Sequence, residues 1–384
     1  MKRSNMGAAV FALTLVAAAC GSSASTSAPP NTAATTAVAT VATVATAPAA
    51  DAKAEAAKYL TAPTKINQTE KLTGKVPSGT VVIIGCELPQ CNVISDGAKA
   101  AAKAIGWKTE YLQYNALGDG AATLHQAMVD ALTYKPIVVM PIGFSQQVWQ
   151  DLVPEYEKAG VIITSMADGD NAPGGAVTIG ASNASDYIKS GEIMAAWFIA
   201  DSGGKGKALV QDTPAYAVLK KYGDGFKAKV AEICSGCSIT PLDIAPAQLA
   251  DAAPTVVSAL QKDPSIKYVI ATDGAFLAGL PAALKAANIT GVQIAGGAAD
   301  VNNMTELTTG GNSAWTAEAP QQFGWVAVDI AAKTLLKMPI TADADGGRPQ
   351  MLVTKDNVGS PNDWPLGLRF PADYQDQFKA LWGV

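Results

Sequence analysis

Short apolar runs alternate along this chain with longer stretches that have helical periodicity. The apolar runs are continuous, which is typical of strands that are buried on both faces. We predict such strands at Thr80–Ile84, Ile137–Met140, Val161–Thr164, Ala208–Val210, Tyr268–Ala271 and Val292–Ala295. We predict helices at Val93–Ile105, Ala121–Leu132, Gln146–Lys158, Ile188–Ile199, Tyr216–Ala231, Gln248–Leu260, Ala275–Ala287 and Phe323–Leu336. This alternation predicts an α/β fold with parallel sheets.

The alternating region, from about Pro77 to Val384, is longer than a single hydrophobic core usually requires. Cores stop growing at about 250–300 residues, so we expect two lobes. The chain carries 28 basic and 33 acidic side chains, a formal net charge of −5, and its basic residues form no stripe. Nucleic acid is therefore not an expected partner.

The N-terminus has a basic start, a short apolar stretch and small residues, which together are typical of a secretory signal. The apolar stretch is shorter than the ~20 residues that span a bilayer. It ends in Ala17-Ala-Ala-Cys20, which resembles the lipobox of bacterial lipoproteins. We therefore expect a signal peptide at residues 1–19, lipidation of Cys20, and a location on the outer face of the bacterial cytoplasmic membrane. An ordinary signal peptide with an incidental cysteine is the alternative.

Residues 20–76 are expected to link this lipid anchor to the folded region. Up to about Ala50 the segment consists almost entirely of Ala, Thr, Val, Ser and Pro, so it has too little bulk to build a core. A flexible coil of some 30 residues reaches roughly 30 Å. Asp51 to Lys75 is more polar and compatible with a helical lead-in.

Four cysteines follow Cys20 in two closely spaced pairs. An even number at short spacing in an exported chain favours two local disulfides, Cys86–Cys91 and Cys234–Cys237. A redox motif at Cys234-Ser-Gly-Cys237 is one alternative, although it ends a helical stretch instead of starting one. A four-cysteine zinc site is another, but it would have to join distant segments. We expect neither a metal nor a cofactor.

Five short motifs follow one another in order along the alternating region. They are Ser95-Asp-Gly-Ala98, Ile179-Gly-Ala-Ser-Asn183, Lys221-Tyr-Gly-Asp-Gly-Phe226, Ile270-Ala-Thr-Asp273 and Thr316-Ala-Glu-Ala-Pro320. In this order, the region from Gly79 to Lys337 resembles the type I periplasmic binding proteins of ABC importers, in the ribose-binding branch. The resemblance implies two doubly wound parallel-sheet lobes joined by a three-segment hinge.

The lobe boundaries follow from the same resemblance. Residues 77–182 with 319–346 are expected to form the N-terminal lobe, and residues 183–318 with 347–384 the C-terminal lobe. The tail from about Asp343, which contains Trp364 and Trp382, is longer than is usual in that branch. We expect it to pack on the second lobe.

The resemblance also implies a function. It implies an extracytoplasmic substrate-binding lipoprotein that captures a small polar solute, such as a sugar or polyol, by closing a cleft. The loaded protein is then expected to dock to an ABC permease. We expect it to act as a monomer.

Candidate ligand contacts lie beyond the carboxyl ends of the strands, where open parallel sheets bind ligands. They are Glu87, Gln90, Phe144, Ser145, Asp168, Tyr216, Lys220, Asp273 and Glu318. Each has a structural alternative. Asp273 precedes Gly274 and could cap a helix, and Lys220 could be a solvated helix charge.

Three departures from the sugar binders of that branch bear on the solute. The loop after the first strand has Gln90-Cys91 where those sugar binders tend to have two phenylalanines. Gly297-Ala298 lacks the Asp that follows the corresponding glycine in many of them, and no Arg is available on the second-lobe helix. A pyranose held by stacking and by Arg–Asp pairs is therefore not expected. Several carboxylates suit a polyol, a small diol or a cation-bearing solute, because they accept hydrogen bonds from hydroxyl and ammonium groups.

Catalytic patterns are scarce. The one histidine, His125, lies in a helical stretch with apolar neighbours, and there is no Gly-x-Ser-x-Gly motif or His-rich metal spacing. We therefore predict that the protein is not an enzyme. A carboxylate-based hydrolase is the enzymatic alternative, and a ligand-sensing partner of a membrane receptor is the other.

Overall fold

The computed structural model describes residues 47–169, 172–182, 184–340, 347–359 and 370–384, all within one compact unit. The predicted signal peptide, Cys20, the first part of the tether and Trp364 lie outside the described residues. No helix in these ranges is long and apolar enough to cross a membrane.

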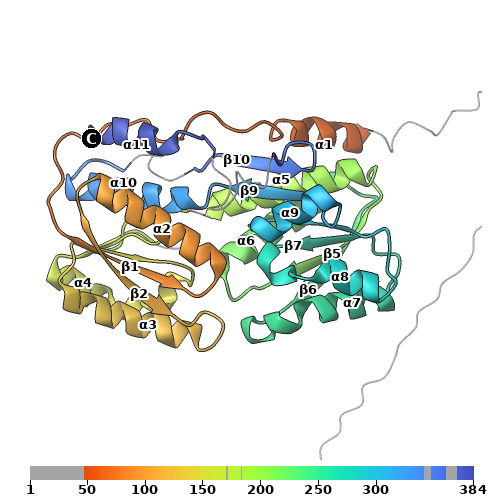
Figure 1. Cartoon of the computed structure of the whole chain (residues 1–384), viewed down its shortest axis with the longest axis horizontal. Coiled ribbons are helices and arrows are strands. Elements are labelled where there is room, and N and C mark those ends of the chain that lie inside the picture. Colours follow the sequence, from red (N-terminus) through yellow and green to blue (C-terminus); the bar gives the residue numbers. More distant parts are fainter. Residues whose placement is uncertain (1–46, 170–171, 183, 341–346, 360–369) are drawn as a thin grey trace, which may run out of the picture. The chain divides into compact units, whose positions relative to one another are not determined.

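The first lobe contains a four-stranded parallel sheet in the order β2-β1-β3-β4 (Figure 1). Its strands are β1 (Thr80–Cys86), β2 (Lys108–Tyr114), β3 (Val138–Pro141) and β4 (Ile162–Ile163). Its helices are α2 (Pro89–Ala104), α3 (Gly120–Ala131), α4 (Val153–Ala159) and α10 (Gln321–Leu335). Three short 3-10 turns precede β3 and α4: η1 (Leu132–Tyr134), η2 (Gln146–Val148) and η3 (Gln150–Leu152). Every residue of β1 after Thr80 is buried, so both faces of this sheet are covered.

The second lobe contains a six-stranded sheet in the order β10-β9-β8-β7-β5-β6. Its strands are β5 (Lys207–Asp212), β6 (Ser238–Asp243), β7 (Tyr268–Ala271), β8 (Gln293–Gly296), β9 (Ala314–Glu318) and β10 (Gln350–Thr354). Its helices are α5 (Ala184–Asp201), α6 (Ala217–Ile233), α7 (Ala252–Lys262), α8 (Leu280–Ala286) and α9 (Val301–Thr309), with 3-10 turns η4 (Pro246–Asp251) and η5 (Gly274–Leu277). Only β10 is antiparallel to its neighbour, so the prediction of parallel sheets in two lobes is confirmed.

Both predicted disulfides are present, one in each lobe. Cys86–Cys91 joins the end of β1 to the first turn of α2, and Cys234–Cys237 joins the end of α6 to the turn before β6. The first therefore spans Glu87 in the loop and Gln90 in the first turn of α2.

One glycine in each lobe allows two helices to approach closely. A Cβ at Gly97 of α2 would lie 2.1 Å from the carbonyl oxygen of Gln321, and one at Gly191 of α5 would lie 2.1 Å from that of Tyr222. Both distances are below any real van der Waals contact, so only glycine fits. The pairs α2–α10 and α5–α6 therefore cross at backbone contact. Residues of all four helices line the space between the lobes.

The chain passes between the two sheets three times near this space. It passes at residues 179–182 after β4, at Ala319 after β9, and at Arg348 before β10. Cleft closure in two-lobed proteins is accommodated at such crossings, because a few residues absorb the change in backbone angles.

The N-terminal segment is not a free tether up to residue 76, and the helical lead-in considered for Asp51–Lys75 is present in part as α1. Residues Ala47–Ala57 form α1, which packs on α5, and the chain then runs along the C-terminal segments. The Tyr59 carbonyl accepts from Leu352 N (2.7 Å), and Leu72 N donates to the Leu381 carbonyl (3.0 Å). Polar residues at Asp51–Lys75 obscured this packing, because its bonds are made to segments about 300 residues away in the chain.

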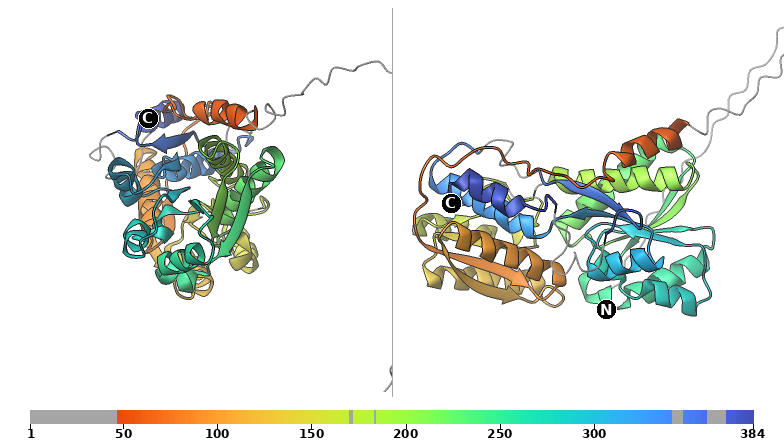
Figure 2. Two further views of the ribbon diagram at one scale, coloured as in Figure 1. Left: turned by 90° about the vertical axis from the view of Figure 1, so that its right-hand side faces the viewer. Right: turned by 45° about the horizontal axis from the view of Figure 1, so that its top comes forward.

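The C-terminal helix also differs from the prediction. β10 joins the second sheet, but α11 (Tyr374–Trp382) packs on α10 of the first lobe, beside which it lies in Figures 1 and 2. The rings of Trp325 and Trp382 stack with centroids 5.2 Å apart, and Trp382 Nε1 donates to Asp329 Oδ1 (2.8 Å). Asp329 in turn forms a fully buried ion pair with Lys333 (2.8 Å). Apolar and polar contacts together thus hold the tail on the first lobe.

Candidate ligand-binding site

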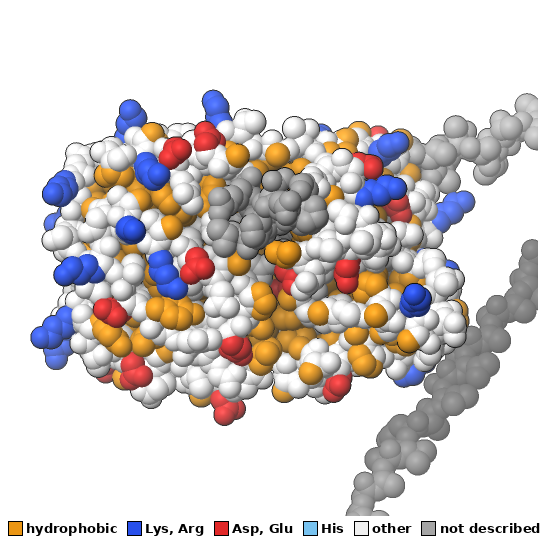
Figure 3. All heavy atoms as spheres, in the orientation of Figure 1, with side chains coloured by type: hydrophobic (Ala, Val, Ile, Leu, Met, Phe, Trp, Pro, Cys, Tyr) orange, Lys and Arg blue, Asp and Glu red, His pale blue; other side chains and the backbone are white. Residues whose placement is uncertain are grey.

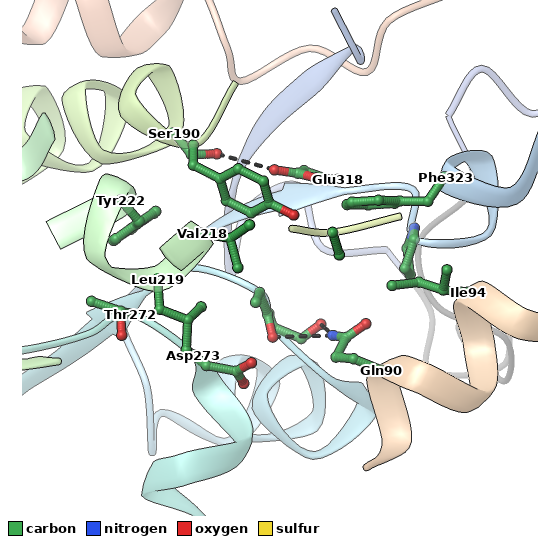
Figure 4. Close-up of a pocket in the computed structure, with 15 residues that line it drawn as sticks. Gln90, Ile94, Ser190, Val218, Leu219, Tyr222, Thr272, Asp273, Glu318 and Phe323 are labelled. Carbon is green, nitrogen blue, oxygen red and sulfur yellow. Dashed lines mark hydrogen bonds between the residues drawn. The ribbon is translucent and has the colours of Figure 1, made fainter. Parts of the chain in front are cut away.

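A cavity of about 110 Å³ lies between the two lobes, and its walls come from both (Figure 4). The first lobe contributes Gln90 and Ile94 from α2, Ala167, and Pro320 and Phe323 from the start of α10. The second lobe contributes Tyr187, Ser190, Val218, Leu219, Tyr222, Thr272, Asp273, Ala298, Ala299 and Glu318. Most of these follow the carboxyl ends of β7, β8 and β9 or lie on α5 and α6, so the cavity occupies the position expected of a ligand in open α/β sheets.

Asp273 follows β7 and faces the cavity. Its Oδ1 accepts from Ala275 N (2.9 Å), so it also caps η5. Burial raises its pKa to about 7, with a smaller contribution from the charge of Asp300, although the bond from Ala275 acts in the opposite direction. Asp273 therefore changes charge near neutral pH and can present either a neutral or an ionised carboxyl group to a solute.

Glu318 ends β9 and faces the cavity from the second crossing. Arg348 Nε and Nη2 donate to its Oε2 (3.1 and 2.7 Å), and Ser190 Oγ lies 3.5 Å from its Oε1. Burial alone would lower the pKa of Arg348, but the carboxylates of Glu318 and Asp186 raise it above its ordinary value. The guanidinium therefore stays charged and fixes one carboxylate oxygen, while the other remains an acceptor.

Gln90 lies in the first turn of α2 and reaches across the cavity. Its Nε2 donates to the carbonyl oxygens of Ala298 (3.2 Å) and Ala299 (3.4 Å), which follow β8. These hydrogen bonds join the two lobes directly.

Six predicted contacts are not among the residues that line the cavity. Glu87 accepts from Ala116 N and Leu117 N (both 2.9 Å); burial raises its pKa, but these and other backbone bonds lower it below the ordinary value. Ser145 caps η2 by accepting from Gln147 N (3.4 Å). These two residues therefore shape loops.

The other four serve packing or the surface. The rings of Phe144 and Tyr216 pack with centroids 5.1 Å apart, and Tyr216 OH donates to the Ala116 carbonyl (3.0 Å). Lys220 is exposed and pairs with Asp224, and Asp168 is buried but does not line the cavity. Of the nine predicted contacts, the structure brings together Gln90, Asp273 and Glu318.

Several cavity residues were not predicted. Ser190 and Tyr222 lie on helices that were predicted, whereas Tyr187 lies one residue before the predicted start of its helix. The one-turn spacing of Tyr187 and Ser190 is a signal that could have indicated a shared face. Thr316 Oγ1 donates to Tyr222 OH (3.2 Å) and thereby orients the ring. Arg348 was missed because no periodic pattern surrounds it, although it is the only arginine among the described residues. Those residues also contain no group of three or more His, Cys, Asp or Glu side chains that could hold a metal ion.

Solved structures share this fold. A solute-binding protein of an ABC transporter from Mycobacterium smegmatis, with bound glycerol, is 21% identical with a TM-score of 0.62, and the alignment covers 77% of this chain and 99% of that one. One from Agrobacterium vitis, bound with α-D-tagatopyranose, is 22% identical with a TM-score of 0.61, over 76% and 99%. Another from the same organism, with bound allitol, is 19% identical with a TM-score of 0.61, over 74% and 97%.

Sequence comparisons agree with the fold. No curated protein matches the chain. The family model of the periplasmic binding protein domain matches residues 87–337, which include most of both lobes and the first two crossings. The chain therefore belongs to the periplasmic binding protein domain family.

Proposed function

We propose that this protein is the extracytoplasmic solute-binding component of an ABC importer and captures a small neutral, hydroxyl-rich solute such as a polyol or a monosaccharide. The observation that carries the proposal is the cavity between the lobes, with Gln90, Asp273 and Glu318 on its walls. A solute that contacts both lobes stabilises the closed arrangement and shifts the population towards it.

The lining supports this choice of solute. It includes two carboxyl groups and several hydroxyl groups, while no Lys or Arg is among the lining residues described above. Carboxylates accept hydrogen bonds from hydroxyls and repel anions. The cavity, at about 110 Å³, is also well below the roughly 300–1,000 Å³ of sites for drug-sized ligands. Glycerol, allitol and a ketose are bound by the similar structures, which supports the same class here.

The proposal extends to location and partners. A lipid anchor at Cys20 would keep the protein on the outer face of the cytoplasmic membrane. There the protein would act as a monomer and deliver its solute to an ABC permease. On the face drawn in Figure 3, Lys and Arg are scattered among acidic side chains and form no stripe, which agrees with a partner other than nucleic acid. We infer binding without chemical conversion, in keeping with a family of binding proteins.

The lipid anchor has its own test. Cys20→Ala should move the protein from the membrane to the soluble fraction, and a mature N-terminus at another residue would exclude the anchor.

The function is tested with purified protein that lacks residues 1–46 and keeps α1 and the segment after it. Thermal shift and calorimetry are run with glycerol, allitol and tagatose, and with glucuronate as an anionic control. A solute that binds the folded state should add about 2.7 kcal/mol of stability at a hundred times its dissociation constant. We expect at least one neutral solute to bind and glucuronate not to bind. Binding of glucuronate alone would contradict the proposal.

A further inference from the structure

Arg348 is a buried cation behind the cavity wall. Only 4% of its surface is exposed, and it lies beyond residue 337, where the match to the family model ends. A buried guanidinium requires carboxylate or carbonyl partners, because an unpaired charge in this environment is strongly destabilising. Its partners therefore indicate which parts of the molecule it holds together.

These partners lie on the other two crossings between the lobes. Arg348 itself lies on the third crossing. Its Nη1 donates to the carbonyl oxygen of Ala181 on the first crossing (2.8 Å), and its Nε and Nη2 donate to Glu318 at the second (3.1 and 2.7 Å). Asp186 at the start of α5 lies 3.5 Å from Nη1. One side chain thus joins all three crossings.

The same guanidinium also contacts the cavity wall from behind. Its central carbon lies 3.6 Å from the ring centroid of Phe323 and 5.7 Å from that of Tyr187, and both rings line the cavity. Both hydrogen bonds to Glu318 go to Oε2, whereas Oε1 lies near Ser190, another lining residue. One residue therefore contacts three lining side chains: Glu318, Phe323 and Tyr187.

We propose that Arg348 is the positioning residue of the ligand site, which orients Glu318 and Phe323 towards the solute and couples them to the three crossings. The solute named in the test rests on the proposed function, but the coupling to the crossings does not. Arginine suits this role because its planar fork donates in three directions at once, which the single ammonium group of lysine cannot do in the same geometry.

A purely structural role is the alternative, and Lys333 provides a matched control. Lys333 is a fully buried cation on α10 that pairs with Asp329 on the same helix (2.8 Å). This ion pair involves no residue of the three crossings. Arg348→Met and Lys333→Met each leave buried carboxylates without a cation, so both variants should have a lower melting temperature. A change in melting temperature alone therefore does not distinguish positioning from packing.

The first measurement needs no ligand. Hydrogen exchange of the backbone amides in residues 179–182 and 314–318 is followed in Arg348→Met, Arg348→Lys and Lys333→Met. We expect at least tenfold faster exchange in Arg348→Met, an intermediate rate in Arg348→Lys, and the wild-type rate in Lys333→Met. Exchange that is equal in Arg348→Lys and the wild type, at a temperature at which both are folded, would overturn the proposal. Arg348→Lys keeps this test decisive if Arg348→Met fails to fold.

The second measurement is a double-mutant cycle with allitol, glycerol or tagatose, whichever the wild type binds. Loss of an oriented charge-assisted acceptor should weaken binding about ten- to a hundredfold in Arg348→Met and less in Arg348→Lys. In protein that already carries Glu318→Gln, Arg348→Lys should lower the affinity by less than about threefold, because the oriented carboxylate is already absent. Additive effects would overturn the positioning role. If no probe binds the wild type, the proposed function fails, and the exchange measurement still decides the role of Arg348.

Discussion

The two sides of the cavity are built differently. The second lobe provides both carboxyl groups, Asp273 and Glu318, and the hydroxyls of Ser190 and Thr272. The first lobe provides mainly apolar surface together with the amide of Gln90. The second lobe therefore carries most of the hydrogen-bonding capacity, whereas the first lobe covers the solute and links to the second through Gln90. Substitutions on the second-lobe side should accordingly weaken binding more.

The largest effect is expected at Asp273. Asp273→Asn keeps an oxygen that can cap η5 but removes the ionisable group. We expect about ten- to a hundredfold weaker binding at pH 8, since a charge-assisted hydrogen bond contributes about 1.5–3 kcal/mol. Calorimetry with the solute identified in the thermal-shift screen measures this. Lys220→Ala, which removes an exposed predicted contact, should bind like the wild type.

The pH dependence of this variant sharpens the assignment. In the wild type, affinity for a hydroxyl-bearing solute should rise as the pH increases through about 7, because the ionised Asp273 is the better acceptor. The sign for stability is the opposite. Folding raises the pKa of Asp273, so the contribution of this group to the free energy of unfolding is complete below its unfolded pKa. That contribution is lost as the pH rises to about 7. Both slopes should be smaller in Asp273→Asn, and unchanged slopes would assign the titration to another group.

This site shows what local sequence patterns can and cannot predict. Glu87 and Glu318 are both acidic residues at strand ends, and both were predicted as ligand contacts. The structure separates them, because Glu87 is occupied by the amides of Ala116 and Leu117 whereas Glu318 faces the cavity. Arg348 bonds to residues 30 and 167 positions away in the chain, and no local pattern encodes such pairs.

The fold was more predictable than the site, for a physical reason. Strands buried on both faces, such as β1 and β7, are continuous apolar runs, and they were predicted. The edge strands β2 and β6 are only partly buried and lack such runs, so they were missed. The buried strands β9 and β10 were missed as well, because Thr316, Glu318 and Gln350 interrupt their apolar residues. The helix predicted at Ala275–Ala287 divides into η5 and α8, because Gly279 adopts a φ of 78° and Pro281 lies in the first turn of the next helix.

A smaller effect is expected on the first-lobe side, at Gln90. Gln90→Ala removes two neutral hydrogen bonds to the carbonyls of Ala298 and Ala299, which join the lobes. Neutral bonds contribute about 0.5–1.5 kcal/mol each, so affinity should fall about two- to tenfold. Small-angle scattering should show a larger fraction of open molecules at subsaturating solute. Gln147→Ala, at an exposed glutamine, is the control, and an affinity loss for Gln90→Ala as large as that for Asp273→Asn would contradict the division between the lobes.

The smallest effect should distinguish the two disulfides. Cys86–Cys91 ties the first turn of α2, which carries Gln90, to the end of β1, whereas Cys234–Cys237 lies between α6 and β6, and neither of its residues lines the cavity. Both close short loops, so replacing either pair with alanine should cost at most about 2–3 kcal/mol of stability. Affinity should differ: a loss of up to about threefold is expected only for the Cys86/Cys91 variant, because a less restrained loop holds Gln90 less firmly against Ala298. Calorimetry at a temperature at which both variants are folded makes the comparison. Equal affinities in the two variants would indicate that α2 alone positions Gln90 and that this disulfide contributes only stability.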